Sequence, residues 1–217
     1  PDAVIIGQTF AEETQALCSR LDSQKIPYVF VDSVAECTNP VETFTTDQHS
    51  CGYLQGRLLH MITPPGSALA IFNTLSIGDS ESSNSQARRQ GFIDYLTDNG
   101  ITGLLKEAAF SVMDPEEAES ILLDFLERNR DVKGIAVLNS RGHILADILE
   151  ANRISDIRIV SFDLTSNNRR CLRDGYISAL LCQKPELQGF NAVKAIINKL
   201  LYNNPVENPH TLMPIDI

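Results

Sequence analysis

The chain has 217 residues, of which 43% are hydrophobic, and a formal net charge of -10 at pH 7. This length and hydrophobic content suffice for one large domain or for two modest lobes, each with its own core. The acidic balance argues against this segment gripping nucleic acid itself, and no apolar run is long enough to cross a bilayer.

Cysteine usage and the start of the sequence bear on the cellular compartment. The cysteines are odd in number, scattered and without a Cys-x-x-Cys pair, at Cys18, Cys37, Cys51, Cys171 and Cys182. This pattern favours reduced thiols in a cytoplasmic protein, and no basic-then-apolar leader opens the sequence. The histidines show no metal-ligand spacing, so we expect neither a metal site nor a cofactor.

The first part of the chain alternates strand and helix signals. Strands are expected at residues 3–6, 28–31 and 43–46, and helices at 12–24 and 47–61. The second helix is expected to be capped by Asp47 and to bury an apolar stripe of Cys51, Leu54, Leu58 and Met61. The Thr-Pro-Pro-Gly sequence at 63–66 then breaks the pattern and indicates a crossing between two lobes.

A second alternating series follows. It predicts strands at 67–72, 104–110, 135–138, 157–162, 177–182 and 211–217, with helices near 86–98, 115–126, 144–149, 167–174 and from 185 to an Asn-Asn-Pro stop at 203–205. A polar loop at 73–85 carries Asp79 and Glu81. The expected fold class is therefore α/β, with two lobes whose parallel sheets are flanked by helices. The first lobe would comprise 1–64 plus 184–207, and the second 65–183 plus 208–217.

Polar side chains stand where the predicted strands end. Asp32, Asn139, Asp163 and Gln183 follow strands, and Arg88 lies near the start of the helix after the polar loop. Helical crossovers make successive strands parallel, and ligands of open α/β sheets bind at the carboxyl edge. Carboxylate, amide and guanidinium groups have fixed hydrogen-bonding geometry, which suits a polyhydroxylated small molecule. Turn, helix-cap and hinge roles remain the alternatives, and Arg89 is expected to point to solvent.

At these residues the sequence resembles the effector domain of lac-repressor-type (LacI/GalR) transcription regulators. The matching pieces are 26–32, Asp47 with Gly52 downstream, 88–92, 134–139, 159–163 and Gln183 before the last long helix. The resemblance spans essentially the whole chain and implies the type I periplasmic-binding-protein fold. The sequence departs from the family pattern at Ser140, where aspartate is usual, and at Ser161, where glycine is usual.

The resemblance also implies a site and a mechanism. Arg88, Asn139, Asp163 and Gln183 would contact an effector from the second lobe or the hinge, and Asp32 and Asp47 would approach from the first. An effector in the inter-lobe cleft would favour closure and so move paired lobes in a homodimer, which would alter the spacing of two DNA-reading heads. The helix-turn-helix that precedes such domains, and their opening strand-helix-strand-helix segment, are absent from this sequence, so the first lobe is expected to be incomplete.

Three function classes compete at this point. The first is the ligand-sensing domain of a cytoplasmic transcription regulator, with a sugar, a sugar phosphate or a purine as effector. The second is a periplasmic sugar-binding protein of a transporter or sensor kinase. The third, an α/β enzyme, lacks support because the sequence contains no Gly-x-Ser-x-Gly, no Gly-rich phosphate loop and no Ser/His/Asp or Cys/His set. We therefore expect no catalytic residues.

Overall fold

The computed structural model describes residues 1–75, 83–202 and 209–217, and the chain forms two compact units. Unit 1 comprises Pro1–Asp47 and Gln183–Ile215, and unit 2 comprises Gln48–Cys182 and Asp216–Ile217. Most of the predicted polar loop, including Asp79 and Glu81, lies outside the described residues, as does the predicted helix stop at 203–205. Among the described helices, none combines the length and hydrophobicity that crossing a membrane requires.

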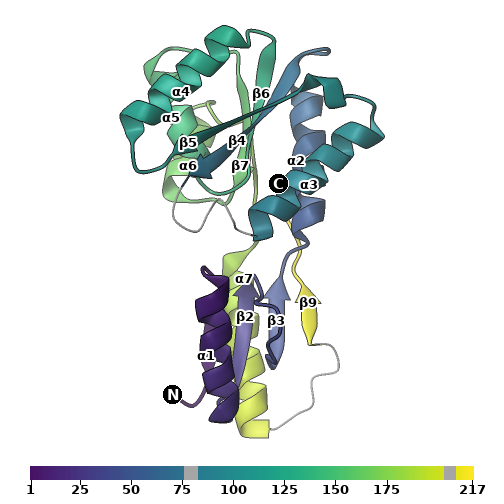
Figure 1. Ribbon diagram of the computed structural model, residues 1–217, viewed down its shortest axis with the longest axis vertical. Coiled ribbons are helices and arrows are strands. Elements are labelled where there is room, and N and C mark those ends of the chain that lie inside the picture. The colour runs from purple at the N-terminus through teal and green to yellow at the C-terminus, as the bar shows by residue number, and fades with distance from the viewer. Residues whose placement is uncertain (76–82, 203–208) are drawn as a thin grey trace. The chain divides into compact units, whose positions relative to one another are not determined.

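Unit 1 is a parallel sheet with a helix on each face (Figure 1). Its strand order is β1-β2-β3-β9, with β1 at Val4–Gly7, β2 at Tyr28–Asp32, β3 at Glu42–Thr45 and β9 at His210–Leu212. Helix α1 spans Ala11–Ser23, and α7 spans Pro185–Ile197 before a π-helical turn at Asn198–Tyr202.

Alternation along β2 explains this layering, because successive side chains of a strand point to opposite faces. Phe30 packs with Cys18 of α1, whereas its neighbour Val29 packs with Ala192 and Ala195 of α7. The long helix that begins at Pro185 therefore belongs to the first unit, as the sequence predicted.

Unit 2 is a larger parallel sheet covered on both faces (Figure 1). The strand order is β5-β4-β6-β7-β8, with β4 at Ala68–Leu75, β5 at Leu105–Ser111, β6 at Val132–Val137, β7 at Arg158–Phe162 and β8 at Ala179–Leu181. Helices α4 (Pro115–Arg128), α5 (Gly142–Ala151) and α6 (Ser166–Arg173) contribute Leu122, Leu145 and Cys171 to one core cluster. Helices α2 (Gln48–Ile62) and α3 (Ser83–Asp98) pair with each other, and a 3-10 turn at Thr102–Leu104 precedes β5.

The first boundary between the units corrects the sequence prediction. Helix α2 was expected in the first lobe, with the crossing near residues 63–66, but the crossing lies between Asp47 and Gln48. The reason is visible at Gln55, which is fully buried and donates to the carbonyls of Val137 in β6 (3.0 Å) and Val160 in β7 (2.8 Å). Hydrogen bonds to two strands of the second sheet place α2 in unit 2.

The buried face of α2 also differs from the predicted apolar stripe. Cys51 is buried, but Met61 is 68% exposed, and the buried set is Gln48, Cys51, Gly52, Gln55, Gly56 and Leu59. Small residues face α3: a Cβ added to Gly52 would lie 1.8 Å from the carbonyl oxygen of Arg88. The buried face of α2 is the one whose small residues allow close backbone contact with α3, and not the most apolar one. A prediction from hydropathy therefore chose the wrong face.

The assignment of the last residues of the chain to a lobe was also wrong. Residues 208–217 were assigned to the second lobe, yet β9 pairs in parallel with β3 of unit 1, with Thr43 opposite His210. The final crossing lies between Ile215 and Asp216, and Asp216 forms an antiparallel bridge with Cys182 of unit 2.

Candidate functional site

The carboxyl edge of the sheet in unit 2 contains a topological switch point. From β4 the chain first continues to β5 on one side and then to β6 on the other. The crevice between the carboxyl ends of such strands is the usual ligand position in open α/β sheets. A pocket of about 290 Å³ lies there, lined by Asn73, Thr74, Leu75, Ser85, Gln86, Arg89, Ala109, Leu138 and Asn139.

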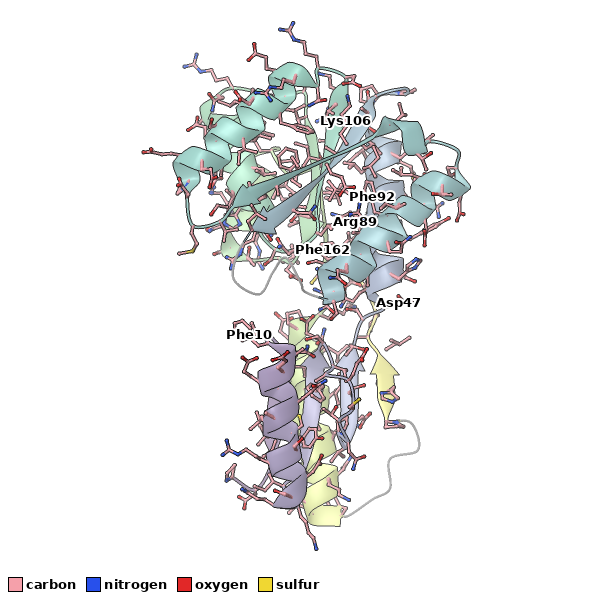
Figure 2. All side chains as sticks on the ribbon, in the orientation of Figure 1. Phe10, Asp47, Arg89, Phe92, Lys106 and Phe162 are labelled. Atoms are coloured by element: carbon pink, nitrogen blue, oxygen red, sulfur yellow. The ribbon has the colours of Figure 1, made fainter. Side chains whose placement is uncertain are left out.

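Arg88 is held within this edge by three kinds of contact. It is only 4% exposed, and its Nε donates to Gln48 Oε1 at 2.7 Å. Its Nη1 donates to the carbonyl of Leu138 at 2.7 Å, and its guanidinium lies 3.9 Å from the ring centroid of Phe162, as a cation–π contact. Figure 2 labels Phe162 at the end of β7.

These contacts bring the predicted residues of unit 2 together. Leu138 immediately precedes Asn139, and Phe162 immediately precedes Asp163. One guanidinium therefore touches the residue before each of the other two candidates. Arg88, Asn139 and Asp163 share one sheet edge, as the sequence predicted from their positions.

Asn139 uses both ends of its amide. Nδ2 donates to the hydroxyl of Thr74 at 2.7 Å, and Oδ1 accepts from the backbone N–H of Arg141 at 3.0 Å. The second bond is an Asx turn, so part of the alternative interpretation of Asn139 as a turn or cap residue holds. The first bond joins the ends of β6 and β4, and both residues line the pocket.

Asp163 has a backbone that L-residues seldom adopt, with φ +63°. Its N–H donates to the carbonyl of Leu181 at 2.8 Å, and its carbonyl accepts from Asn168 Nδ2 at 3.0 Å. Asn168 is fully buried and also accepts from the N–H of His143 at 3.0 Å. Such strained residues persist where the surroundings fix them, and they cluster at functional sites.

Unit 1 has a comparable network at the carboxyl edge of its own sheet. Asp32, the last residue of β2, has φ +67°, and its N–H donates to Gln188 Oε1 at 2.8 Å. Gln188 Nε2 donates to the carbonyl of Gln183 at 2.9 Å, and the hydroxyl of Thr46 donates to Gln183 Oε1 at 2.8 Å. Asp32 and Gln183, distant in sequence, are thus joined through Gln188.

Asp47 has a different setting from the other candidates. It is exposed, it is the last residue of unit 1, and α2 begins at the next residue. That next residue, Gln48, is the one that holds Arg88 Nε. Asp47 thus lies directly beside the chain crossing.

Ser140 and Ser161, the departures from the family pattern, have different roles. Ser140 does not cap α5, because the N-cap is Arg141, without a side-chain cap bond. Ser161 Oγ instead accepts from the N–H of Gly142 at 3.2 Å and donates to the carbonyl of Asn139 at 2.7 Å. A side chain of β7 therefore accepts a hydrogen bond from one of the backbone N–H groups at the start of α5.

Family comparison agrees with this architecture. The sequence profile described as "Periplasmic binding protein domain" matches residues 1–203. The chain belongs to this family. Among curated proteins, none matches the chain.

Solved structures similar to this periplasmic binding protein domain include a regulator and sugar-binding proteins of transport systems. A candidate LacI transcriptional regulator from Bacteroides fragilis is 29% identical, with a TM-score of 0.89 over 100% of this chain and 74% of that one. GanP, a glucose-galactose binding protein from Geobacillus stearothermophilus, is 23% identical, with a TM-score of 0.80 over 99% and 75%. A solute binding protein of an ABC transporter from Agrobacterium vitis, bound with alpha-D-tagatopyranose, is 20% identical, with a TM-score of 0.82 over 99% and 74%. The fold is the type I periplasmic-binding-protein fold.

Several buried polar residues next to the candidate residues of this periplasmic binding protein domain escaped the sequence prediction. Gln48, Thr74, Asn168 and Gln188 are buried polar residues, each bonded to a candidate residue. Their signal in the sequence is faint, because a single Gln or Asn within a helical pattern resembles a solvated residue. Burial of an amide is set by tertiary packing alone.

Arg89 is partly exposed, as expected, with 42% of its side chain accessible, but it also holds an ion pair. Its Nε donates to Glu107 Oε2 at 2.8 Å, and Nη2 lies 2.5 Å from Oε1 of the same carboxylate. This two-point hydrogen bond raises the pKa of Arg89 above its ordinary value. Since Arg89 also lines the pocket, it is unsuitable as a neutral control for Arg88.

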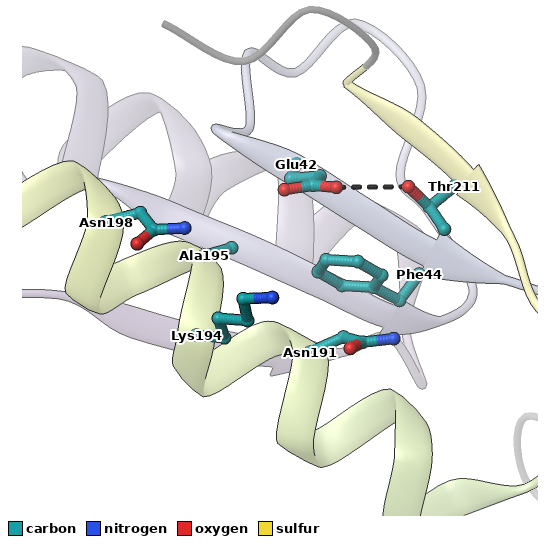
Figure 3. Close-up of a pocket in the computed structure, with 7 residues that line it drawn as sticks. All are labelled: Glu42, Phe44, Asn191, Lys194, Ala195, Asn198 and Thr211. Carbon is teal, nitrogen blue, oxygen red and sulfur yellow. Dashed lines mark hydrogen bonds between the residues drawn. The ribbon is translucent and has the colours of Figure 1, made fainter. Parts of the chain in front are cut away.

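A second hollow of about 310 Å³ lies on the α7 face of the sheet in unit 1 (Figure 3). Its lining residues are Glu42, Phe44, Asn191, Lys194, Ala195, Asn198 and Thr211, none of them a predicted site residue. Glu42 Oε1 accepts from the hydroxyl of Thr211 at 3.0 Å. Within the described part of the chain, no group of His, Cys, Asp and Glu side chains could hold a metal ion.

Proposed function

We propose that this chain is the ligand-sensing domain of a lac-repressor-type transcription regulator and that it binds a sugar. The observation that carries the proposal is the placement of Arg88, Asn139 and Asp163 along the carboxyl edge of the sheet in unit 2, where Arg88 contacts Leu138 and Phe162, the residues before the other two. A fixed guanidinium, an amide and a carboxylate supply donors and acceptors that match neighbouring hydroxyl groups. The regulator-like structure from Bacteroides fragilis supports the sensing role.

Both units contribute groups in this proposal. Asp32 and Asp163 each end a strand with a positive φ, and each is pinned through its backbone N–H. A sugar that uses groups of both units would favour one arrangement of the units over others and so shift their population. The regulator reading adds a homodimer, a DNA-binding segment outside this chain and a cytoplasmic location, all of which are part of the proposal.

The second candidate function is a sugar-binding protein of a transporter or sensor kinase. The glucose-galactose and tagatose-bound neighbours favour it. The gene sequence upstream of the codon for Pro1 separates the two: a helix-turn-helix there supports the regulator, and a signal peptide supports the transport protein.

Affinity measurements on variants of the sheet edge of unit 2 test the binding proposal. Asp163→Asn removes the charge with little change in shape, and Arg88→Lys keeps the charge but loses the planar fork. Each should weaken sugar binding roughly tenfold to a hundredfold, because charge-assisted hydrogen bonds contribute about 1.5–3 kcal/mol apiece. The sugar is first chosen as the one that raises the melting temperature of the wild-type protein most. Calorimetric titration with that sugar then measures the change in affinity.

The matched control is Arg173→Ala. Arg173 is the exposed last residue of α6 in the same unit, so its loss should leave the affinity unchanged. Equal affinities in Asp163→Asn, Arg88→Lys and wild type would show that this sheet edge does not bind the sugar.

A further inference from the structure

We propose that Gln188 is a positioning residue for sugar binding, which orients Asp32 and Gln183 without itself touching the sugar. This inference rests on the proposed function, because it assigns a role within the same site. It concerns unit 1 alone.

The geometry of the Gln188 amide carries the inference. Gln188 lies in the first turns of α7 and is 4% exposed. Its Oε1 accepts from the N–H of Asp32 at 2.8 Å, and its Nε2 donates to the carbonyl of Gln183 at 2.9 Å. A buried amide thus uses one acceptor and one donor on two predicted ligand residues.

Both targets need external support. Asp32 has φ +67°, and Lys184, which follows Gln183, has φ +52°. Residues other than glycine hold such conformations only where neighbouring groups fix them. The bond from Gln188 fixes the backbone of Asp32, and the backbone sets the direction in which the carboxylate points.

The side chain of Gln183 is fixed separately. Thr46, just after β3, donates its hydroxyl to Gln183 Oε1 at 2.8 Å, while Gln188 holds the Gln183 carbonyl. The ends of β2 and β3 and the start of α7 therefore meet in one hydrogen-bonded chain. The Gln188 amide supplies the acceptor and the donor together.

Two substitutions distinguish the hydrogen bond to Asp32 from the hydrogen bond to Gln183. Gln188→Met keeps the length of the side chain and removes both hydrogen bonds. Gln188→Glu keeps an acceptor for the Asp32 N–H and loses the donor to Gln183. The sugar affinity of each variant is measured by calorimetry on the intact protein, with a panel of aldohexoses, aldopentoses and ketohexoses that includes D-glucose, D-galactose and D-tagatose.

We expect Gln188→Met to weaken binding of the best sugar roughly tenfold, because the two hydrogen bonds that orient Asp32 and Gln183 are lost. Gln188→Glu should differ from it, because Glu keeps the acceptor for the Asp32 N–H but places a carboxylate oxygen against the carbonyl of Gln183. The difference between the two variants should disappear in an Asp32→Ala background, since the retained acceptor then has no carboxylate to orient. A merely structural role would give the same difference in both backgrounds.

The control is Gln15→Leu, in the same unit, where the amide donates to the carbonyl of Glu36 at 3.1 Å and is exposed. Its affinity should match that of wild type. If no sugar of the panel binds wild type, the proposed function fails and this inference fails with it. If a sugar binds wild type and Gln188→Met with equal affinity, the inference alone fails. Should Gln188→Met not fold, the Gln188→Glu comparison in the two backgrounds decides the matter.

Discussion

At the scale of single residues, Ser161 shows how a departure from a family pattern is used. Its hydroxyl is fully buried and joins the N–H of Gly142 to the carbonyl of Asn139. Ser161→Ala should lower the free energy of unfolding by about 1–3 kcal/mol, because it leaves two polar backbone groups without this partner. Urea denaturation measures the loss. Ser19→Ala is the control, since the Ser19 hydroxyl bonds within an exposed turn of α1 and should change stability by less than about 0.5 kcal/mol.

At the scale of elements, the contact between α2 and α3 depends on glycine at two positions. A Cβ on Gly52 would lie 1.8 Å from the Arg88 carbonyl oxygen, and one on Gly91 would lie 1.9 Å from the His49 carbonyl oxygen. Gly52→Ala should therefore force the helices apart and lower the free energy of unfolding by about 3 kcal/mol. It should also weaken sugar binding, because Arg88 is held by Gln48 of α2.

Gly189→Ala in α7 is the matched control for that substitution. A Cβ there meets nothing within 4 Å, so the helix propensity of alanine should raise the free energy of unfolding by about 0.5–1 kcal/mol. Opposite signs in urea denaturation are expected for the two glycines. A neutral Gly52→Ala would show that the helices do not depend on this close contact.

At the scale of the whole molecule, the chain has separate cores joined at three crossings. Phe30→Ala in unit 1 and Phe72→Ala in unit 2 each remove a fully buried ring and should cost about 3–5 kcal/mol. Hydrogen exchange measured by mass spectrometry should show the loss of protection confined to the unit that carries the substitution. Equal loss in both units would mean that they unfold as one cooperative body.

The sequence by itself determined the α/β class, the positions of most elements and the candidate residues at strand ends. Asp32 ends a strand of unit 1, and Asn139 and Asp163 follow strands of unit 2; parallel strands of one sheet end at a common edge, so periodicity placed each residue at the carboxyl edge of its own sheet. The helix from Pro185 was also assigned to the right unit.

Tertiary structure decided what local pattern does not encode. The boundary at Asp47 and Gln48 follows from the hydrogen bonds of Gln55 to the second sheet and from backbone contact at Gly52. The burial of Gln188 likewise depends on partners far away in the chain. A lone amide or glycine has the same local signature in solvent and in a packed interface, because its hydrogen bonds and contacts are chosen by elements that only folding brings together.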